Sequence, residues 1–281
     1  MKVVSLKKRK FIDNTVKGLS IASASIGIFA LIWILFEVLK RGLSSINLDF
    51  FIKFPTPPGI EGGGVLNAIV GTLSMTLLAT VIGVPLGLLT GVYLSEYGRH
   101  NKFGAVVQFS TNVMMGIPSI IVGLFVYTLL VVPLGHFSGY AGAVSLAIIM
   151  LPVVGRTSAD MLVLVPNALR ESALALGAPR WKVTVGVVFR AAKTGLITGS
   201  LLGIARVSGE TAPLLFTALN SPYMPTSLNE PTANLTVTIF NYAMSPYANW
   251  QRLAWGSSLL IMVSVLIITI FARLTFKEVR K

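Results

Sequence analysis

The chain has 281 residues, of which 54% are hydrophobic and 12% are charged, and its mean hydropathy is +0.78. Soluble domains carry about twice this share of charged residues, so the composition excludes a soluble enzyme, and its hydrophobicity excludes intrinsic disorder. In a soluble protein a net charge of +13 would indicate a nucleic-acid partner. Here the positions of the basic residues along the chain decide which partner the charge indicates. With no cysteine and two histidines, the sequence predicts no disulfide, no metal site and no other cofactor.

Six hydrophobic segments predict an all-α membrane protein with six transmembrane helices, at residues 19–39, 66–94, 105–134, 141–155, 191–219 and 251–273. A helix needs about 20 apolar residues to cross the ~30 Å hydrocarbon layer. Straight helices over the second and fifth segments would each exceed ~40 Å, so we expect them to tilt, kink or protrude. The fourth segment is short unless its helix continues past Arg156. The first follows a Lys-rich tail and is too long for a signal peptide, so we expect it to be retained.

Basic residues concentrate on one side of this predicted membrane protein. Most of the 23 Lys and Arg residues lie in the N-terminal tail, in 95–104, in 155–193 or near the C-terminus. The positive-inside rule therefore places these regions and both termini in the cytoplasm. Anionic headgroups of the lipid bilayer attract such charge, so no nucleic-acid partner is expected.

The second segment carries a glycine every four residues, at Gly83, Gly87 and Gly91, with Pro85 inside the run. Such a stripe of small residues lets the backbone of another helix approach closely. We therefore expect this segment to pack against a neighbouring helix along the stripe.

The predicted cytoplasmic loop 155–193 contains a helix–turn–helix pattern. A short helix is predicted from about residue 166, and its apolar face would hold Leu169, Ala173 and Leu176. Gly177 is placed to end this helix in the left-handed conformation, and Pro179 suits the start of the next helix. The pattern fits a solvated connector or a docking surface for a cytoplasmic partner.

The fifth segment combines a glycine stripe with two charges. Gly195, Gly199 and Gly203 recur every four residues, and Arg206 and Glu210 continue the same face. An unpaired Arg at membrane depth costs about 3 kcal/mol or more, and a partner one turn away reduces that cost. The pair is therefore either a structural salt bridge inside the bundle or an anion-handling site on a water-filled path. The second interpretation uses the planar, permanently charged fork of the guanidinium.

Directly after these charges the sequence predicts a break in the helix. Gly209 weakens a helix, and Pro213 cannot donate a hydrogen bond to the Gly209 carbonyl. A half-helix that begins near Thr211 would direct backbone N–H groups towards an anion. Arg206, Glu210 and Thr211 together therefore form the candidate substrate path.

Glu171, Ser172 and Ala173, followed after three residues by Gly177, resemble the EAA–G coupling motif of ABC importer permeases. The resemblance implies that this loop inserts a short helix into a cleft of an ATPase subunit. Ser172 replaces the usual central Ala, and residues 189–190 (Phe-Arg) replace the usual Leu-Pro at the end of the motif.

Two further segments indicate which group of importer permeases the chain resembles. Residues 205–215 (ARVSGETAPLL) and 116–125 (GIPSIIVGLF) resemble the phosphate permeases of the Pst system. The similarity extends over most of 66–273 and is closer to the PstA type than to the PstC type. It implies a type I ABC importer permease (MetI-like) with cytoplasmic termini, in the inner membrane of a bacterium or archaeon. It also implies that Arg206 and Glu210 take part in phosphate passage.

The same resemblance implies partners and a division of the chain. The partners would be a homologous PstC-type permease, two cytoplasmic PstB-type ATPase subunits and an extracytoplasmic PstS-type phosphate-binding protein. The chain itself would be non-catalytic, because it has no G-x-x-x-x-G-K-[ST] phosphate loop, and residues 59–64 (GIEGGG) lack the Lys. Residues 1–65 would hold the N-terminal tail, the first helix and an outer loop. Residues 66–273 would form the permease domain with its coupling loop 155–193, and 274–281 a cytoplasmic tail.

The residues leave three other functions open. The nearest is a permease for another oxyanion, such as molybdate or phosphonate. An ion-coupled secondary transporter would use Arg206 and Glu210 as a proton relay, and a membrane scaffold or sensor would transport nothing. ATPase subunits that co-purify with the chain would favour the ABC importer, whereas a lone active chain would favour the secondary transporter.

Overall fold

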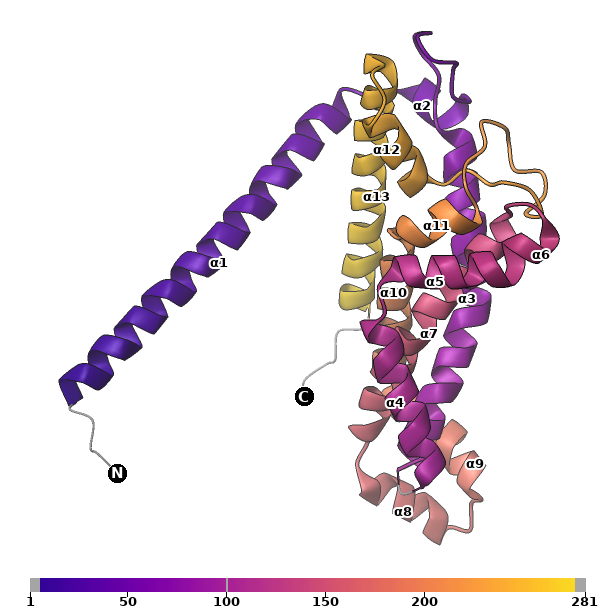
Figure 1. The fold of residues 1–281 in the computed structure, drawn as a ribbon. Helices are drawn as coiled ribbons and strands as arrows, with labels where there is room; N and C mark the ends of the chain where they lie inside the picture. Colours follow the sequence, from indigo (N-terminus) through magenta and orange to yellow (C-terminus); the bar gives the residue numbers. More distant parts are fainter. Residues whose placement is uncertain (1–5, 100, 276–281) are drawn as a thin grey trace.

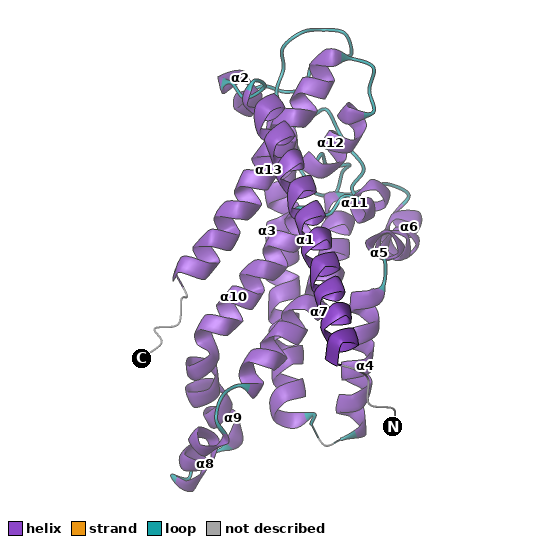
Figure 2. Ribbon diagram, turned by 90° about the vertical axis from the view of Figure 1, so that its left-hand side faces the viewer, coloured by secondary structure: helices purple, strands orange, loops and turns teal. Residues whose placement is uncertain are grey.

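The computed structural model describes residues 6–99 and 101–275, and within these it contains helices and loops but no strand (Figure 2). The α-helices in chain order are α1 Leu6–Leu43, α2 Leu48–Ile52, α3 Leu66–Val92, α4 Lys102–Gly116, α5 Ser119–Val126, α6 Val132–Leu134, α7 Gly139–Val163, α8 Asn167–Ala175, α9 Arg180–Val183, α10 Phe189–Ser208, α11 Ala212–Thr217, α12 Leu235–Ala243 and α13 Ala248–Thr275. Three π-helical turns join or extend them, at Tyr93–Tyr97, Tyr127–Val131 and Thr184–Val188.

The described residues contain five helical stretches that are long and apolar enough to cross a membrane: Lys7–Leu43, Leu66–Tyr97, Gly139–Val163, Arg180–Ser208 and Ala248–Ala272. A sixth crossing is possible only as a bent pair, 102–116 and 119–134, whose axes turn by 104°. The expected all-α membrane architecture is confirmed, but 105–134 is not one helix. Ile117 is extended (φ −72°, ψ 128°), because the ring of the following proline disfavours a helical conformation of the residue before it. Pro118 is extended as well.

Two other segments differ from their predicted bounds. α7 continues to Val163, past Arg156, so the fourth crossing has full length and the connection that follows it is shorter than the predicted loop 155–193. α10 ends at Ser208, and the chain resumes as α11, so the predicted break of the fifth segment is confirmed. One of the two histidines (His100), Lys2 of the Lys-rich tail and the charged residues beyond 275 lie outside the described residues.

The core of the bundle is α7, which packs against both α3 and α10. A Cβ added at Gly87 of α3 would come within 2.7 Å of the Val154 Cβ, and one at Gly203 of α10 within 2.8 Å of the Val154 Cγ2. The two predicted glycine stripes therefore pack on the same helix. Only a residue without a side chain permits backbones to approach this closely.

α1 stands apart from the rest of the bundle (Figure 1). It contacts α13 at its C-terminal end, where a Cβ on Gly42 would come within 2.6 Å of the Leu259 Cβ. Most of its large apolar side chains, such as Phe29 and Trp33, are exposed. In Figure 1 the bundle carries α8 and α9 at one end and α2 and α12 at the other, so the predicted coupling helix and the predicted outer loops lie at opposite ends.

Candidate functional site

The chain leaves α10 through two short-range backbone hydrogen bonds before α11 begins. The last turn of α10 tightens, because the Gly209 N–H donates to the Arg206 carbonyl and the Glu210 N–H to the Val207 carbonyl, each at 3.2 Å. Pro213 is the second residue of α11, a position at which the backbone N–H has no intrahelical acceptor. The proline therefore ends one helix and begins the next.

Gly209 contributes less to this break than the sequence suggested. Its backbone angles (φ −99°, ψ 2°) are open to any residue, and a Cβ there would meet only the Arg206 carbonyl oxygen, at 3.7 Å. Neither a left-handed conformation nor a close contact requires glycine at this position. The break thus rests on Pro213 and on the contacts around it.

Two neighbouring elements hold the break in place. A Cβ on Gly123 of α5 would come within 2.6 Å of the Pro213 Cα, so α5 and α11 pack backbone to backbone. The Thr236 hydroxyl of α12 donates to the Glu210 carbonyl at 2.8 Å. Gly123 and Pro213 belong to the two motifs that carry the Pst resemblance, and the structure brings these motifs into contact. No local pattern in the sequence predicts this contact or the role of Thr236.

Arg206 and Glu210 approach each other without forming a hydrogen bond. The Arg206 Nε lies 3.9 Å from the Glu210 Oε1, with 52% of the arginine side chain and 16% of the glutamate side chain exposed. Such a separation allows Coulomb attraction but no shared proton. Thr211 precedes α11, and its hydroxyl does not cap that helix. The three predicted substrate-path residues are therefore adjacent, and no side chain of the described residues accepts a hydrogen bond from the Arg206 guanidinium.

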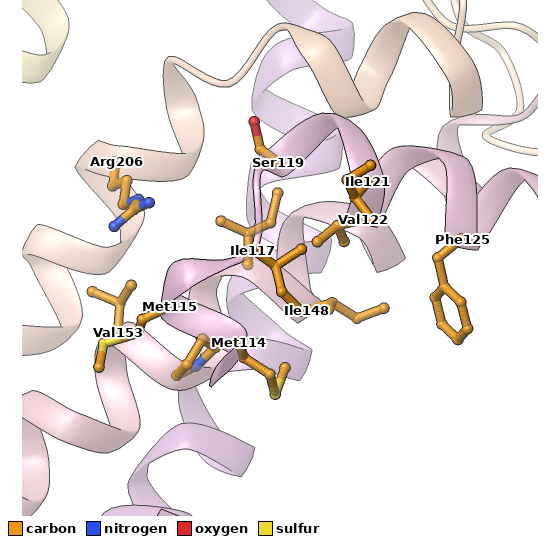
Figure 3. Close-up of a pocket in the computed structure, with 12 residues that line it drawn as sticks. Met114, Met115, Ile117, Ser119, Ile121, Val122, Phe125, Ile148, Val153 and Arg206 are labelled. Atoms are coloured by element: carbon orange, nitrogen blue, oxygen red, sulfur yellow. The ribbon is translucent and has the colours of Figure 1, made fainter. Parts of the chain in front are cut away.

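The Arg206 side chain faces a pocket of about 310 Å³ at the bend between α4 and α5 (Figure 3). Of the 12 residues that line it, Arg206 is the only charged one, and Ser119 is the only other polar one. The remaining lining is apolar, with Met114 and Met115 on the α4 side. A charge in apolar surroundings interacts with an anion more strongly than one in water. No pattern in the sequence predicts this pocket, because it forms where the chain bends at Pro118.

The predicted coupling helix is present as α8. Its end is a Schellman motif: the Gly177 N–H donates to the Leu174 carbonyl at 2.9 Å, and the Ala178 N–H to the Ala173 carbonyl at 3.3 Å. Gly177 has φ +81° and no atom within 4 Å of the place of a Cβ, so the backbone conformation alone requires glycine there. The predicted left-handed end of this helix is confirmed.

The motif residues of α8 face away from the bundle. Glu171 and Ser172 are exposed, whereas Ala173 is half-buried against the core. Leu176 is 88% exposed and Trp181 is 60% exposed, although both are large and apolar. Large apolar side chains that remain exposed beside a motif of this kind are typical of a docking surface. Among the described residues no group of three His, Asp or Glu side chains could hold a metal ion.

Residues 83–281 match the protein family described as binding-protein-dependent transport system inner membrane component, and this range includes both the helix break and α8. The chain belongs to this family. It is 48% identical over 270 residues to the phosphate transport system permease protein PstA of Haemophilus influenzae, covering 96% of this chain and 95% of the relative. The probable PstA protein of Methanocaldococcus jannaschii is 38% identical over 255 residues, covering 90% and 89%.

Solved structures of ABC transporters share the fold of this chain. A bacterial alginate ABC transporter chain has a TM-score of 0.67 at 17% identity and covers 98% of both chains. A chain of the MetNI methionine ABC transporter has a TM-score of 0.61 at 21% identity and covers 78% of this chain and 95% of its own. The predicted MetI-like importer fold is therefore confirmed.

Proposed function

We propose that this chain is the transmembrane subunit of an ATP-driven importer of inorganic phosphate, and that it forms half of the translocation path. The observation that carries the proposal is the position of Arg206, the single charge that lines the pocket at the bend of α4 and α5. The names of the relatives that are 36–49% identical over nearly the whole chain support the choice of phosphate.

The geometry at the helix break suits a protonated phosphate. Arg206 is permanently charged and has free N–H donors in a planar fork, which matches two oxygens of one oxyanion. The Glu210 carboxylate, 3.9 Å from that fork, can accept the O–H of a protonated phosphate. The Thr211 hydroxyl adds a neutral partner beside them. Together these groups would bind both the negative oxygens and the proton of the substrate.

The other end of the proposed function is the coupling helix α8. In this proposal Glu171, Ser172, Ala173 and Gly177 dock on a PstB-type ATPase subunit, and a PstC-type permease completes the path. A cavity of about 860 Å³ at the opposite end, lined by uncharged residues, would face a PstS-type binding protein. This orientation puts α8 and both termini in the cytoplasm, in keeping with the basic residues near α8. It also keeps the division into 1–65, the permease domain 66–273 and the tail 274–281.

The test is transport by the assembled complex. The chain is tagged and purified from its native membrane together with whatever subunits accompany it, and the complex is placed in liposomes with ATP inside or outside. Uptake of radioactive phosphate is then measured with and without the binding protein, and with molybdate, phosphonate or sulfate as competitor.

We expect stoichiometric ATPase subunits and a phosphate uptake that requires ATP on the α8 side. Uptake of molybdate or phosphonate by a complex that imports no phosphate would assign the chain to another oxyanion. Uptake driven by an ion gradient without ATPase subunits would show that the chain is a secondary transporter. If the complex transports no anion at all, the membrane scaffold or sensor is the remaining function.

A further inference from the structure

A second arginine–glutamate pair joins the coupling helix to the end of α3. The Arg170 Nη2 donates to the Glu96 Oε1 at 2.8 Å, and the Arg170 Nε donates to the Glu96 Oε2 at 3.1 Å. The two side chains are 14% and 11% exposed. Glu96 lies in the π-helical turn Tyr93–Tyr97, which extends α3 and whose extra residue per turn is typical of functional positions.

Every N–H donor of the Arg170 guanidinium is used. Besides the two bonds to Glu96, Nη2 donates to the Leu162 carbonyl at 2.7 Å, and Nη1 donates to the Val165 carbonyl and to the Asn167 Oδ1. A guanidinium has five N–H groups, and here all five have acceptors. Leu162 belongs to the last turn of α7, whose free carbonyls attract a positive charge. One side chain of α8 therefore holds the ends of both α3 and α7.

These contacts continue to the proposed substrate path. α3 and α7 pack on each other along the glycine stripe, and Pro152 and Val153 of α7 line the pocket that Arg206 faces. Because close-packed helices transmit displacements rather than absorb them, movement of α8 at Arg170 would reach that pocket through α7. Glu171 and Ser172 point outwards, and Ala173 adds an apolar contact with the cluster that contains Leu162. Arg170 is the α8 side chain whose hydrogen bonds reach both helix ends.

We infer that Glu96 and Arg170 are positioning residues that transmit the movement of the coupling helix to α3 and α7 during transport. The inference rests on the proposed function, because it requires that α8 docks on an ATPase subunit. The inference adds to the proposed function the contact that connects α8 with α3 and α7 within this chain. The pair touches neither substrate nor ATP, and its role is to make α8 and the two helix ends move as one body.

A structural role alone would lower the amount of folded protein, whereas loss of a mechanical link lowers the transport achieved per ATP. The measurement is therefore the number of phosphate ions imported per ATP hydrolysed by the purified complex in liposomes. The variants are Glu96→Gln, which keeps the size of the side chain, Arg170→Lys, which keeps the charge without the fork, and Arg170→Gln. Subunit content and ATP hydrolysis are measured on the same samples.

The matched controls are Arg156→Gln and Asp160→Asn. Arg156 and Asp160 form an exposed pair one helical turn apart in α7, at 3.1 Å, and they join no separate elements. We expect Arg170→Gln to lower phosphate imported per ATP by at least about tenfold, and Glu96→Gln and Arg170→Lys by about three- to fivefold. ATP hydrolysis and subunit content should stay near wild type, and the controls should keep the wild-type ratio.

The double variant Glu96→Gln/Arg170→Gln should be no worse than Arg170→Gln alone, because the two side chains act as one unit. A wild-type ratio in all of the Glu96 and Arg170 variants would overturn the inference and leave the proposed function intact. A loss of subunits that runs parallel to the loss of transport would assign the pair to folding and would also overturn it. A wild-type complex that imports no phosphate would overturn both proposals.

Discussion

The two arginine–glutamate pairs of this chain have opposite geometries. Arg170 and Glu96 lie 74 positions apart in the sequence, yet they are buried and share two hydrogen bonds. Arg206 and Glu210 are one helical turn apart, yet they approach only to 3.9 Å and the arginine is half-exposed. Spacing in the sequence would rank the second pair as the tighter one, and the structure reverses that order.

The surroundings of each arginine explain the reversal. Backbone carbonyls at the end of α7 converge on Arg170 and fix its guanidinium, so this side chain has no donor left for a ligand. Arg206 faces a largely apolar pocket, and none of the hydrogen bonds of the described residues uses its guanidinium. An arginine whose N–H donors are all hydrogen-bonded within the protein suits a rigid link between helices. An arginine with free donors suits reversible binding of an anion. The variants below test this contrast, from the largest expected effect to the smallest.

Gly177→Pro should abolish phosphate import by removing the end of the coupling helix. Proline fixes φ near −65°, whereas Gly177 has φ +81°, so the chain must leave α8 along another path. The variant complex in liposomes should show import below detection, with normal insertion of the chain in the membrane. Gly186→Ala is the control, because Gly186 also has open space around it but no left-handed backbone, and it should import normally. Import by Gly177→Pro at the wild-type rate would show that α8 does not couple.

Arg206→Ala should lower phosphate import by about 100-fold. Loss of a charged hydrogen-bonding partner costs about 3 kcal/mol, and each 1.4 kcal/mol is about tenfold. Arg206→Lys should lose only about tenfold, because the ammonium keeps the charge but lacks the bidentate fork. Initial rates of phosphate uptake in liposomes measure the effects of both Arg206 variants. The control is Lys193→Ala, at an exposed position of the same helix. Full activity of Arg206→Ala would reduce this pair to a structural role.

Much of the architecture follows from signals that are local in the sequence. The glycine stripes, the break before Pro213 and the left-handed end at Gly177 each depend on residues within about two helical turns, and each hydrophobic segment is one continuous run of the sequence. Their physical causes, helix propensity and close backbone approach, act over that same range. Such features were therefore predictable without the structure.

The features that the sequence did not predict depend on which helices meet. No local sequence signal distinguishes Glu96, and only the fold places it against Arg170. Gly123 and Pro213 belong to two motifs that are far apart in the sequence, and the fold brings them into contact. The pocket at Arg206 requires the 104° bend at Pro118, and the angle of a bend cannot be predicted from the presence of a proline in the sequence.

Glu171→Lys should weaken docking of the ATPase subunit by about tenfold through reversal of one exposed charge at the interface. Glu171 is exposed and makes no contact that holds α8 in place, so the chain itself should fold normally. Titration of the purified permease pair with the ATPase subunit measures the affinity. A matching change at Glu61, at the other end of the bundle, should have no effect. Unchanged affinity in Glu171→Lys would remove this residue from the docking surface.

Glu210→Gln should have the smallest effect on flux and a distinct effect on selectivity. The Glu210 carboxylate, with only 16% of its side chain exposed, would repel a fully deprotonated oxyanion such as sulfate, and the repulsion grows as water is excluded. A protonated phosphate avoids this penalty, because its O–H donates to the carboxylate while Arg206 holds other oxygens. Sulfate has no proton to donate near neutral pH. The amide of Gln removes the negative charge and supplies a donor, so it should favour sulfate relative to phosphate.

The assay must bypass the binding protein, which would otherwise reject sulfate before it reached the membrane. In a transporter variant selected to import without its binding protein, Glu210→Gln should lower phosphate flux and raise the sulfate-to-phosphate ratio by about threefold, the equivalent of ~0.7 kcal/mol. Glu230→Gln removes the same charge from an exposed loop and should leave the ratio unchanged. If both variants give the wild-type ratio, Glu210 only balances the charge of Arg206, and selectivity arises outside this helix break.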